Sequence, residues 1–352
     1  MKSTADLLLR DDATIKVALE ALNGTGRYLT IFLIDGSGRL KGSVTDGDIR
    51  RGLLSGATLD SAVSLVMNTA PRTLRDGEPA IDLFTELRAH GIKVLPVIDA
   101  QGHVVRIADL DRQRSVLPVQ ALIMAGGRGM RLRPYTDDLP KPLLPVGGRP
   151  IIEHALELLG RYGISDVSVS VNYLREKIIE HLGNGERYGL KIAYVHEDQP
   201  MGTAGALGRI GHGVHDTVLM MNSDLLTDVA LDRMYKRFME TGADLAVATT
   251  DHMVDLPYAV MDLEGDRVKA FKEKPSVAYP CNAGIYLMKR SVLDLVPKDT
   301  PYNATDLIQD LLDRDAMVVA HRIQGEWLDI GKHEDLKRAR RNTAEHPSGD
   351  PT

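Results

Sequence analysis

The sequence predicts an α/β protein built on a mostly parallel sheet, preceded by a smaller α+β unit. Two observations lead to this fold class. From about Val119 onward, β-rich runs alternate with helical patterns, which is the order of βαβ crossover units. Before that point, the chain contains a weak internal repeat of a helix, a β-rich run, a tight turn and a short strand. With 352 residues and 43% hydrophobic content, the chain can bury the cores of both units.

Composition and charge exclude several classes of protein. The formal net charge of -6 argues against a general nucleic-acid binder, which needs a broad positive surface. No apolar run approaches the roughly 18 residues of a membrane span, and the first residues show no signal peptide. The single cysteine, Cys281, excludes an internal disulfide framework and fits a reducing compartment. We therefore expect a cytoplasmic protein with neither a nucleic-acid nor a membrane partner.

The internal repeat occupies the first third of the chain. Its β-rich runs are Thr30–Ile34 and Val94–Ile98, and the turns 35–38 and 99–102 follow them. Gly and Asp in these turns supply the backbone angles that a hairpin needs. A unit this small cannot bury its apolar face alone, so we expect the two copies to pack on each other. The alternative is an ordinary α+β domain with chance internal similarity.

The run GSVTDGDI, residues 42–49, resembles the cystathionine-β-synthase-type (CBS) modules. In that family a Thr and the Asp three residues later often hold the ribose of an adenosine nucleotide, and these positions are Thr45 and Asp48 here. The second copy departs from the pattern, because 107–109 contains no Thr and Arg106 replaces the preceding Gly. The resemblance implies a tandem CBS pair with at most one regulatory nucleotide site, or a pair that only mediates dimer contacts.

Beyond the junction at 116–119, strands and helices are expected in alternation. Sheets of this kind bind ligands in a crevice beyond the carboxyl ends of their strands. The loops MAGGRG (124–129) and NSD (222–224) directly follow predicted strands, so both should face that crevice. The β-rich runs are 121–125, 167–171, 190–195, 217–222 and 244–249, and the helical patterns are 151–163, 174–183, 203–211 and 231–242.

The loop 124–142 combines glycine with positive charge. Glycines let backbone N–H groups converge on an anion, and guanidinium and ammonium groups bind phosphate oxygens. The loop is not a dinucleotide fingerprint, because Leu132 stands where the third glycine is needed, and it lacks the Gly-Lys-Ser/Thr of a P-loop. From these residues alone it is a phosphate-binding loop of another kind or a solvated basic turn. Its positive side chains include Arg128, Arg131, Arg133 and Lys141.

The same stretch closely resembles the signature G-G-x-G-x-R-L…P-K-P of the sugar-1-phosphate nucleotidyltransferases. The resemblance covers about 119–336, with one small departure at Ser223, where the family more often has Gly. It implies a Rossmann-like, GT-A-type domain with a mixed, mostly parallel sheet. The later matching motifs are 197–205, 222–224, 271–275, 282–286 and 327–331.

In that family, an oxygen of a sugar 1-phosphate attacks the α-phosphorus of a nucleoside triphosphate, and pyrophosphate leaves. The attacking phosphate is largely ionised at neutral pH and needs no general base. The reaction instead needs two polyanions to be positioned and their charge neutralised. By resemblance, Arg131 and Lys141 neutralise the charge and are catalytic together with Asp224, while Asp224 and Asp329 hold Mg²⁺. Without the resemblance, Asp329 would be interpreted as a turn or cap residue.

The resemblance also assigns the residues that bind substrate. His196 and Glu197 do not form a metal site, because adjacent residues on a strand point in opposite directions. Without the resemblance, Glu273 and Lys274 would be a surface ion pair. The nucleotide-binding residues are Ala125, Gly126, Gly127, Gly129, Glu197, Gly202 and Thr203, and the sugar-phosphate-binding residues are Glu273, Lys274, Asn282 and Gly284.

The donor nucleotide follows from Glu197, which stands where the family recognises the base. Guanine presents N1–H and N2–H₂ as donors, so a guanine pocket needs an acceptor such as a carboxylate. The run GTAGAL (202–207) is most similar to guanylyltransferases that activate mannose-like or heptose 1-phosphates. A fused CBS pair is similar to guanylyltransferases of aminosugar 1-phosphates in bacterial surface-glycan pathways. We therefore favour GTP, with UTP, CTP and dTTP as alternatives, and no residue identifies the sugar.

These resemblances imply a domain organisation. It comprises a regulatory tandem CBS domain at 1–115, a linker at 116–119, a catalytic domain at 119–343 and a disordered tail at 344–352. A homo-oligomer, either a dimer or a tetramer, is expected. Two other functions stay open: a nucleotide-sensing CBS protein whose second domain has lost catalysis, and a phosphosugar-binding scaffold. The presence of Arg131, Lys141, Asp224 and Asp329 together argues against the first.

Overall fold

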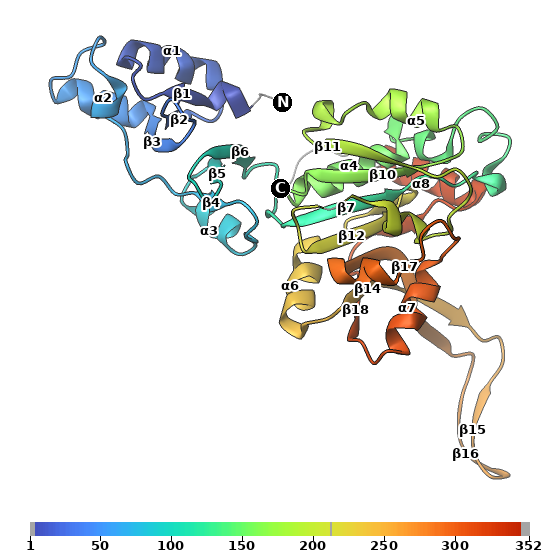
Figure 1. Cartoon of the computed structure of the whole chain (residues 1–352). Helices are drawn as coiled ribbons and strands as arrows, with labels where there is room; N and C mark the ends of the chain where they lie inside the picture. The colour runs from blue at the N-terminus through green and yellow to red at the C-terminus, as the bar shows by residue number, and fades with distance from the viewer. Residues whose placement is uncertain (1–3, 212, 346–352) are drawn as a thin grey trace. The chain divides into compact units, whose positions relative to one another are not determined.

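The computed structural model describes residues 4–211 and 213–345 (Figure 1). The chain divides into two units between Pro118 and Val119, and the short segments Leu159–Ser165 and Gly185–Leu190 group with the first unit. Among the described residues, no helix combines the length and apolar character that a bilayer crossing requires.

The first unit consists of two small α+β modules with the same topology. Each contains a three-stranded sheet whose first two strands are parallel and whose last two are antiparallel. The antiparallel pairs carry register shifts at corresponding places, Leu33/Ile34 and Val97/Ile98. The repeat seen in the sequence is therefore a repeat of structure. The elements are η1 (Thr4–Leu7), β1 (Leu8–Arg10), α1 (Ile15–Thr25), β2 (Thr30–Ile34), β3 (Leu40–Thr45), α2 (Asp46–Leu54) and η2 (Val63–Leu65), then β4 (Leu74–Arg75), α3 (Leu83–Ala89), β5 (Val94–Ile98) and β6 (Val104–Asp109).

The two modules pack on each other, as the small size of each predicts. Each has its own apolar core, and Leu7, Phe32 and Val94 form a smaller cluster that draws on both. Arg27 and the hydroxyl of Tyr28, from the first module, donate to the Asp109 carboxylate of the second at 2.8 and 2.6 Å. The contact between modules is therefore partly apolar and partly an ion pair.

Thr45 and Asp48 form the N-terminal cap of α2. The Thr45 hydroxyl accepts from the N–H of Asp48 at 3.3 Å, and the Asp48 carboxylate accepts from the N–H of Thr45 at 2.8 Å. This reciprocal pair is a capping box, which satisfies two backbone donors of the helix end. Asp109 has the position in β6 that Thr45 has in β3, since they pair with Val94 and Thr30. A nucleotide-binding role for Thr45 and Asp48 stays a prediction.

The second unit is built on a seven-stranded mixed sheet of order β11-β10-β7-β12-β17-β14-β18. Neighbouring strands are parallel except for β17, which is antiparallel to β12 and β14. The predicted α/β class with a mostly parallel sheet is confirmed. The strands are β7 (Val119–Met124), β10 (Asp166–Val171), β11 (Lys191–His196), β12 (Thr217–Asn222), β14 (Leu245–Asp255), β17 (Ser276–Lys289) and β18 (Val318–Arg322).

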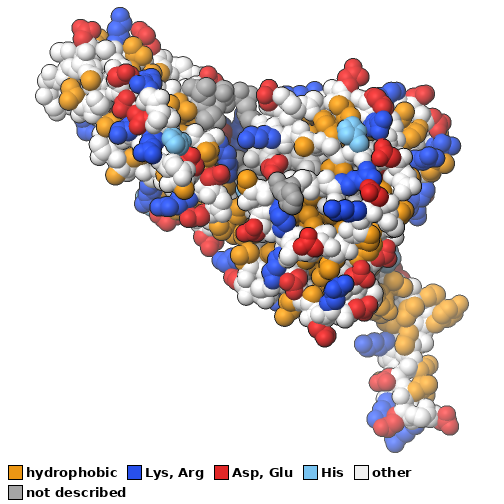
Figure 2. Space-filling view, in the orientation of Figure 1, with side chains coloured by type: hydrophobic (Ala, Val, Ile, Leu, Met, Phe, Trp, Pro, Cys, Tyr) orange, Lys and Arg blue, Asp and Glu red, His pale blue; other side chains and the backbone are white. Residues whose placement is uncertain are grey.

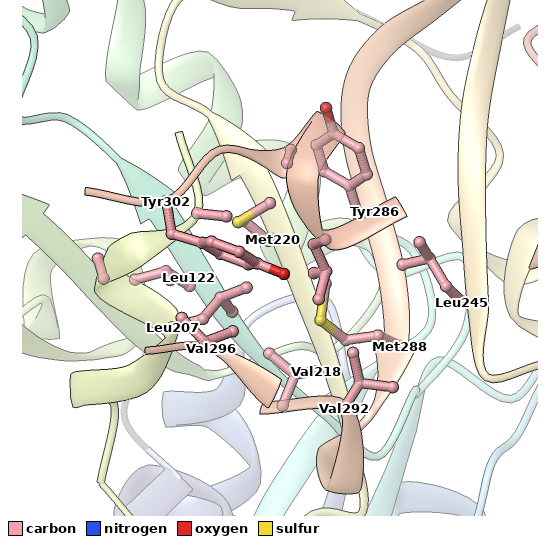
Figure 3. Packing of buried hydrophobic residues seen from close by; sticks show 14 of the residues in the cluster. Leu122, Leu207, Val218, Met220, Leu245, Tyr286, Met288, Val292, Val296 and Tyr302 are labelled. Atoms are coloured by element: carbon pink, nitrogen blue, oxygen red, sulfur yellow. The ribbon is translucent and has the colours of Figure 1, made fainter. Parts of the chain in front are cut away.

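Helices pack against this sheet and bury its apolar residues. The core beneath α7 brings together side chains from β7, β12 and β17, such as Leu122, Met220 and Tyr286 (Figure 3). The methionine Met220 is buried there. The helices are α4 (Ile151–Arg161), α5 (Arg175–Leu182), α6 (Leu231–Thr241), α7 (Ala304–Leu312) and α8 (His333–Glu345). Shorter elements are β8 (Pro145–Val146), β9 (Arg149–Pro150), β13 (Leu225–Thr227), β15 (Val260–Glu264), β16 (Arg267–Lys272), β19 (Trp327–Asp329), η3 (Met130–Leu132), η4 (Lys141–Leu143), η5 (Glu186–Tyr188), η6 (Gly205–Arg209) and η7 (Arg290–Leu295).

Three details differ from the sequence-based expectations. The helical pattern at 203–211 forms only the short 3₁₀ turn η6, since its glycines favour no long helix. Val116, expected in a linker, is buried and exchanges backbone hydrogen bonds with Ala80 at 2.8 and 3.1 Å. Helix α8 continues to Glu345, so the first residues of the expected tail are helical, and 346–352 lie outside the described residues.

Candidate active site

The predicted crevice loops start from adjacent strands. Met124, the last residue of β7, pairs with Asn222, the last residue of β12. The N–H of Ser223 donates to the carbonyl of Met124 at 3.2 Å, which extends this pairing past the strand ends. The glycine-rich loop and the NSD motif therefore leave the same edge of the sheet, where ligands bind in α/β folds.

A separate two-stranded ladder brings Asp224 next to Asp329. Strands β13 and β19 are antiparallel with Leu225 opposite Asp329, and the N–H of Ile330 donates to the carbonyl of Asp224 at 3.1 Å. Burial, and then the negative charge of Asp224, raises the pKa of the Asp329 carboxyl, and the positive charges of Lys141 and Arg131 oppose this rise. The two carboxylates are thus close enough to interact electrostatically.

Lys141 completes this cluster by forming an ion pair with Asp224. Only 13% of the lysine side chain and 19% of the aspartate side chain are exposed, so water screens the pair little. The lysine opens η4, between Pro140 and Pro142, where the fixed proline angles stiffen the backbone. The structure therefore brings together three of the four residues to which the resemblance assigns the chemistry.

The cluster has unused ligand atoms that suit a hard cation. Asp224 Oδ1 and Asp329 Oδ1 are both buried, and neither has a hydrogen-bond partner among the described residues. An unpartnered buried acceptor costs free energy, and a bound cation would satisfy both oxygens. The described residues contain no group of three or more His, Cys, Asp or Glu side chains suited to a metal. Two carboxylates are nevertheless enough for Mg²⁺, which takes its other ligands from water and substrate phosphates.

Arg131, the fourth residue, lies beside the same ladder in η3. Its Nη2 atom lies 3.4 Å from the point that a Cβ at Gly331 would occupy. Its loop is held by the start of α8, where His333 Nε2 donates to the carbonyl of Arg133 at 2.9 Å and the His333 ring packs against Tyr135. The sequence interpretation missed His333, although it stands directly after the WLDIGK run.

Glu197 lies beneath the glycine-rich loop. Its side chain is buried, and a Cβ at Gly126 would lie 3.1 Å from its Oε1 atom, so a larger residue at that position would force the carboxylate to shift. The Ser170 hydroxyl donates to Oε1, and the N–H of Met201 donates to Oε2 at 3.1 Å. A carboxylate has about four acceptor sites, so these partners leave lone pairs for a ligand. Glu197 therefore supports the loop and keeps acceptor capacity.

Gly202 and Thr203 fix the next loop onto α7. The Thr203 hydroxyl accepts from the N–H of Ala304 at 2.9 Å, which satisfies a donor at the first turn of the helix. A Cβ at Gly202 would lie 2.6 Å from the carbonyl oxygen of Tyr302. Both residues therefore have structural contacts, and their contact with a nucleotide stays a prediction.

The predicted sugar-phosphate residues fall into two pairs. Asn282 accepts from the N–H of Gly284 at 2.9 Å, and a Cβ at Gly284 would lie 2.6 Å from Asn222 Nδ2, at the end of β12. This pair therefore borders the crevice. Glu273 and Lys274 lie between β16 and β17, are exposed, and have no hydrogen bond or ion pair within the described part of the chain. The structure does not bring them into contact with the carboxylates.

Comparison with known proteins identifies the second unit and the first module of the first unit. The profile of the nucleotidyl transferase family matches residues 120–346, and that of the CBS domain matches residues 4–55. The chain is 32% identical over 241 residues to a UTP–glucose-1-phosphate uridylyltransferase of Synechocystis sp., covering 63% of this chain and 62% of that protein. It is also 32% identical over 226 residues to the mannose-1-phosphate guanylyltransferase catalytic subunit beta of Danio rerio, covering 62% of each. The chain thus spans about 62% of the length of these relatives.

A solved structure agrees with this comparison. A Bacillus anthracis protein provisionally named glucose-1-phosphate thymidylyltransferase is 26% identical and superposes with a TM-score of 0.54. The match covers 66% of this chain and 98% of that chain.

Proposed function

Because the chain belongs to the nucleotidyl transferase family, we propose that it transfers a nucleoside monophosphate from a nucleoside triphosphate to a sugar 1-phosphate and releases pyrophosphate. The observation that carries the proposal is the cluster of Lys141, Asp224 and Asp329 at the crevice edge of the sheet. The relatives named above are all called nucleotidyltransferases of a hexose 1-phosphate. The family generally uses a divalent metal, and we propose Mg²⁺.

Each residue of the cluster has a role in this proposal. Lys141 and Arg131 bind the substrate phosphates, because charge-assisted hydrogen bonds to phosphate are strong and directional. The backbone N–H groups of Gly126, Gly127 and Gly129 bind oxygens of the triphosphate. Asp224 and Asp329 would hold Mg²⁺, which when bound neutralises charge on the reacting phosphates. The sugar phosphate is already ionised, so none of these residues acts as a base.

The activity is tested by pyrophosphate release. The protein is supplied with Mg²⁺, one of GTP, UTP, CTP or dTTP, and a panel of hexose, heptose and aminosugar 1-phosphates. We expect turnover that requires a sugar 1-phosphate and is highest with GTP. If no combination gives turnover, but adenine or guanine nucleotides bind to the protein in a calorimetric titration, the nucleotide-sensing alternative is favoured instead.

GTP is the donor that we favour, and Glu197 supports it. The names of the relatives include uridylyl, guanylyl and thymidylyl transfer, so the base must be argued from this chain. Glu197 is buried beneath Gly126 and retains free lone pairs, which guanine can fill with its N1–H and N2–H₂ donors. The product of this activity would be a GDP-sugar for surface-glycan biosynthesis.

The change Glu197→Gln should weaken the preference for GTP over UTP by roughly 10-fold or more, since the amide removes one acceptor and leaves guanine donors unpaired. The measurement is the ratio of kcat/KM for the two nucleotides. Ser170→Ala is the matched control, because it loosens the support of the loop without altering the acceptor. If kcat/KM falls equally for GTP and UTP in both variants, Glu197 only supports the loop and does not recognise the base.

We also propose that any regulatory nucleotide binds the first CBS module rather than the second. In the second module, the carboxylate of Asp109 is already bound by Arg27 and Tyr28. In the first, Thr45 and Asp48 lie at the N-terminus of α2 and are bound within the same helix end, by each other and by Arg51.

A further inference from the structure

Strands β15 and β16 form an arm that projects from the second unit (Figure 1). Within residues 4–211 and 213–345, they pair only with each other, outside the main sheet. Every residue of both strands is exposed. A two-stranded ladder that packs on nothing is marginally stable in water. We therefore expect another surface to cover the arm.

The register of the arm sorts its side chains onto two different faces. Residues that pair directly share a face, and successive residues of one strand point to opposite faces. Met261 pairs with Phe271 and Leu263 pairs with Val268, which makes one face apolar. The opposite face carries the pairs Val260 with Lys272, Asp262 with Ala270, and Glu264 with Arg267. The arm is thus amphipathic, with its charge on one side.

The apolar face is more unusual than the charged face, because apolar side chains on it are exposed to water. Met261, Leu263, Val268 and Phe271 are 51%, 57%, 54% and 64% exposed. Figure 2 shows apolar side chains along the arm among the charged ones. If each side chain presents roughly 150 to 200 Å² in full, the four leave roughly 340 to 450 Å² of apolar surface open. An apolar patch of this size on a monomer usually marks an interaction site.

We propose that this face docks against the same face of a second copy of the chain. A standard interface buries about 800 Å² from each partner, of which about 450 to 500 Å² is apolar. The four side chains and the stems of their neighbours supply an area of that order. The same patch on both copies is what a two-fold axis requires.

The register of the arm suits a second copy as the occupant. A two-fold axis along the arm places β15 of one copy over β16 of the other, so that Met261 lies over Phe271 of the partner subunit. The apolar pairs of the two copies then stack on each other, and the charged side chains of the opposite face stay in water.

Docking of the arms would also affect two predicted sugar-phosphate-binding residues. Glu273 and Lys274 directly follow β16 and have no partner within the described residues. Pairing of the arms would restrict the segment that carries them. This consequence rests on the proposed function, whereas docking itself does not.

The test is the molar mass of the full-length protein, measured by light scattering or sedimentation over a range of micromolar concentrations. Leu263→Asp places a carboxylate on the apolar face, where docking would bury it unpaired. We expect the dissociation constant to rise by at least roughly 100-fold, so that the variant has half the mass of the wild type. Val260→Asp is the matched control, because it introduces the same carboxylate in the same strand on the opposite face, beside Lys272.

Phe271→Asp, on the other strand, repeats the test independently. Circular dichroism establishes that each variant is folded, and mass is read without any catalytic assay. A wild type that stays monomeric across the range overturns the proposal. So does a Leu263→Asp or Phe271→Asp protein with the mass of the wild type, since association would then use another surface.

Discussion

Asp224→Asn should lower turnover by roughly 10³-fold, which corresponds to about 4 kcal/mol of lost transition-state stabilisation. Asp224 has one buried oxygen that finds no partner in the described part of the chain, and its other oxygen is in the ion pair with Lys141. The amide keeps the shape of the side chain but removes its negative charge. It therefore removes an anionic ligand and leaves Lys141 without its counter-charge.

Two measurements check this prediction. Pyrophosphate release gives the turnover, and calorimetric titration of Mn²⁺ without substrate reports the affinity of the cation site, which should also fall. The same change at Asp294, an exposed residue of η7, serves as the control and should alter neither. Near-normal turnover and unchanged Mn²⁺ affinity in Asp224→Asn would falsify the assignment of the metal site.

Lys141→Met should reduce turnover by a similar factor but leave cation binding as tight or tighter. Methionine has nearly the length of lysine and no charge, so Asp224 and Asp329 lose the positive charge that offsets their repulsion. A divalent cation then becomes the principal compensation for that repulsion. The substrate phosphates meanwhile lose a charge-assisted donor, and turnover falls.

Turnover and cation affinity, measured together, distinguish a catalytic role of Lys141 from a structural one. Lys289→Met is the matched control, because it breaks another lysine–aspartate pair, with Asp244 at 2.8 Å, away from the crevice edge. That variant should retain turnover within about 2-fold. If saturating Mn²⁺ or Mg²⁺ restores wild-type turnover to Lys141→Met, the lysine serves only to balance the carboxylates.

Much of the fold could be predicted because its determinants are local. The strands Thr30–Ile34 and Val94–Ile98 begin and end where their β-rich runs do, and β12 has the bounds of the predicted run 217–222. In each, the apolar run and the turn residues beside it act within a few positions. The family followed from the spacing of motifs, which is also a property of the chain itself.

The candidate site could be predicted as a set of residues but not as an arrangement. Asp224 and Asp329 meet through the β13–β19 ladder, and Lys141 reaches them from η4. Glu197 supports Gly126 from β11, and His333 supports the loop of Arg131 from α8. None of these contacts joins neighbours in the chain.

The sequence by itself determined the fold class, the repeated module, the family and the residue types available for phosphate chemistry. Only the tertiary structure decided which carboxylate oxygens lack partners, that Thr45 and Asp48 cap a helix, and that one face of the β15–β16 arm is open. The physical reason is that hydrophobic periodicity is written in consecutive residues, whereas these features depend on the register between distant segments. A shift of one residue in such a register turns every side chain to the opposite face.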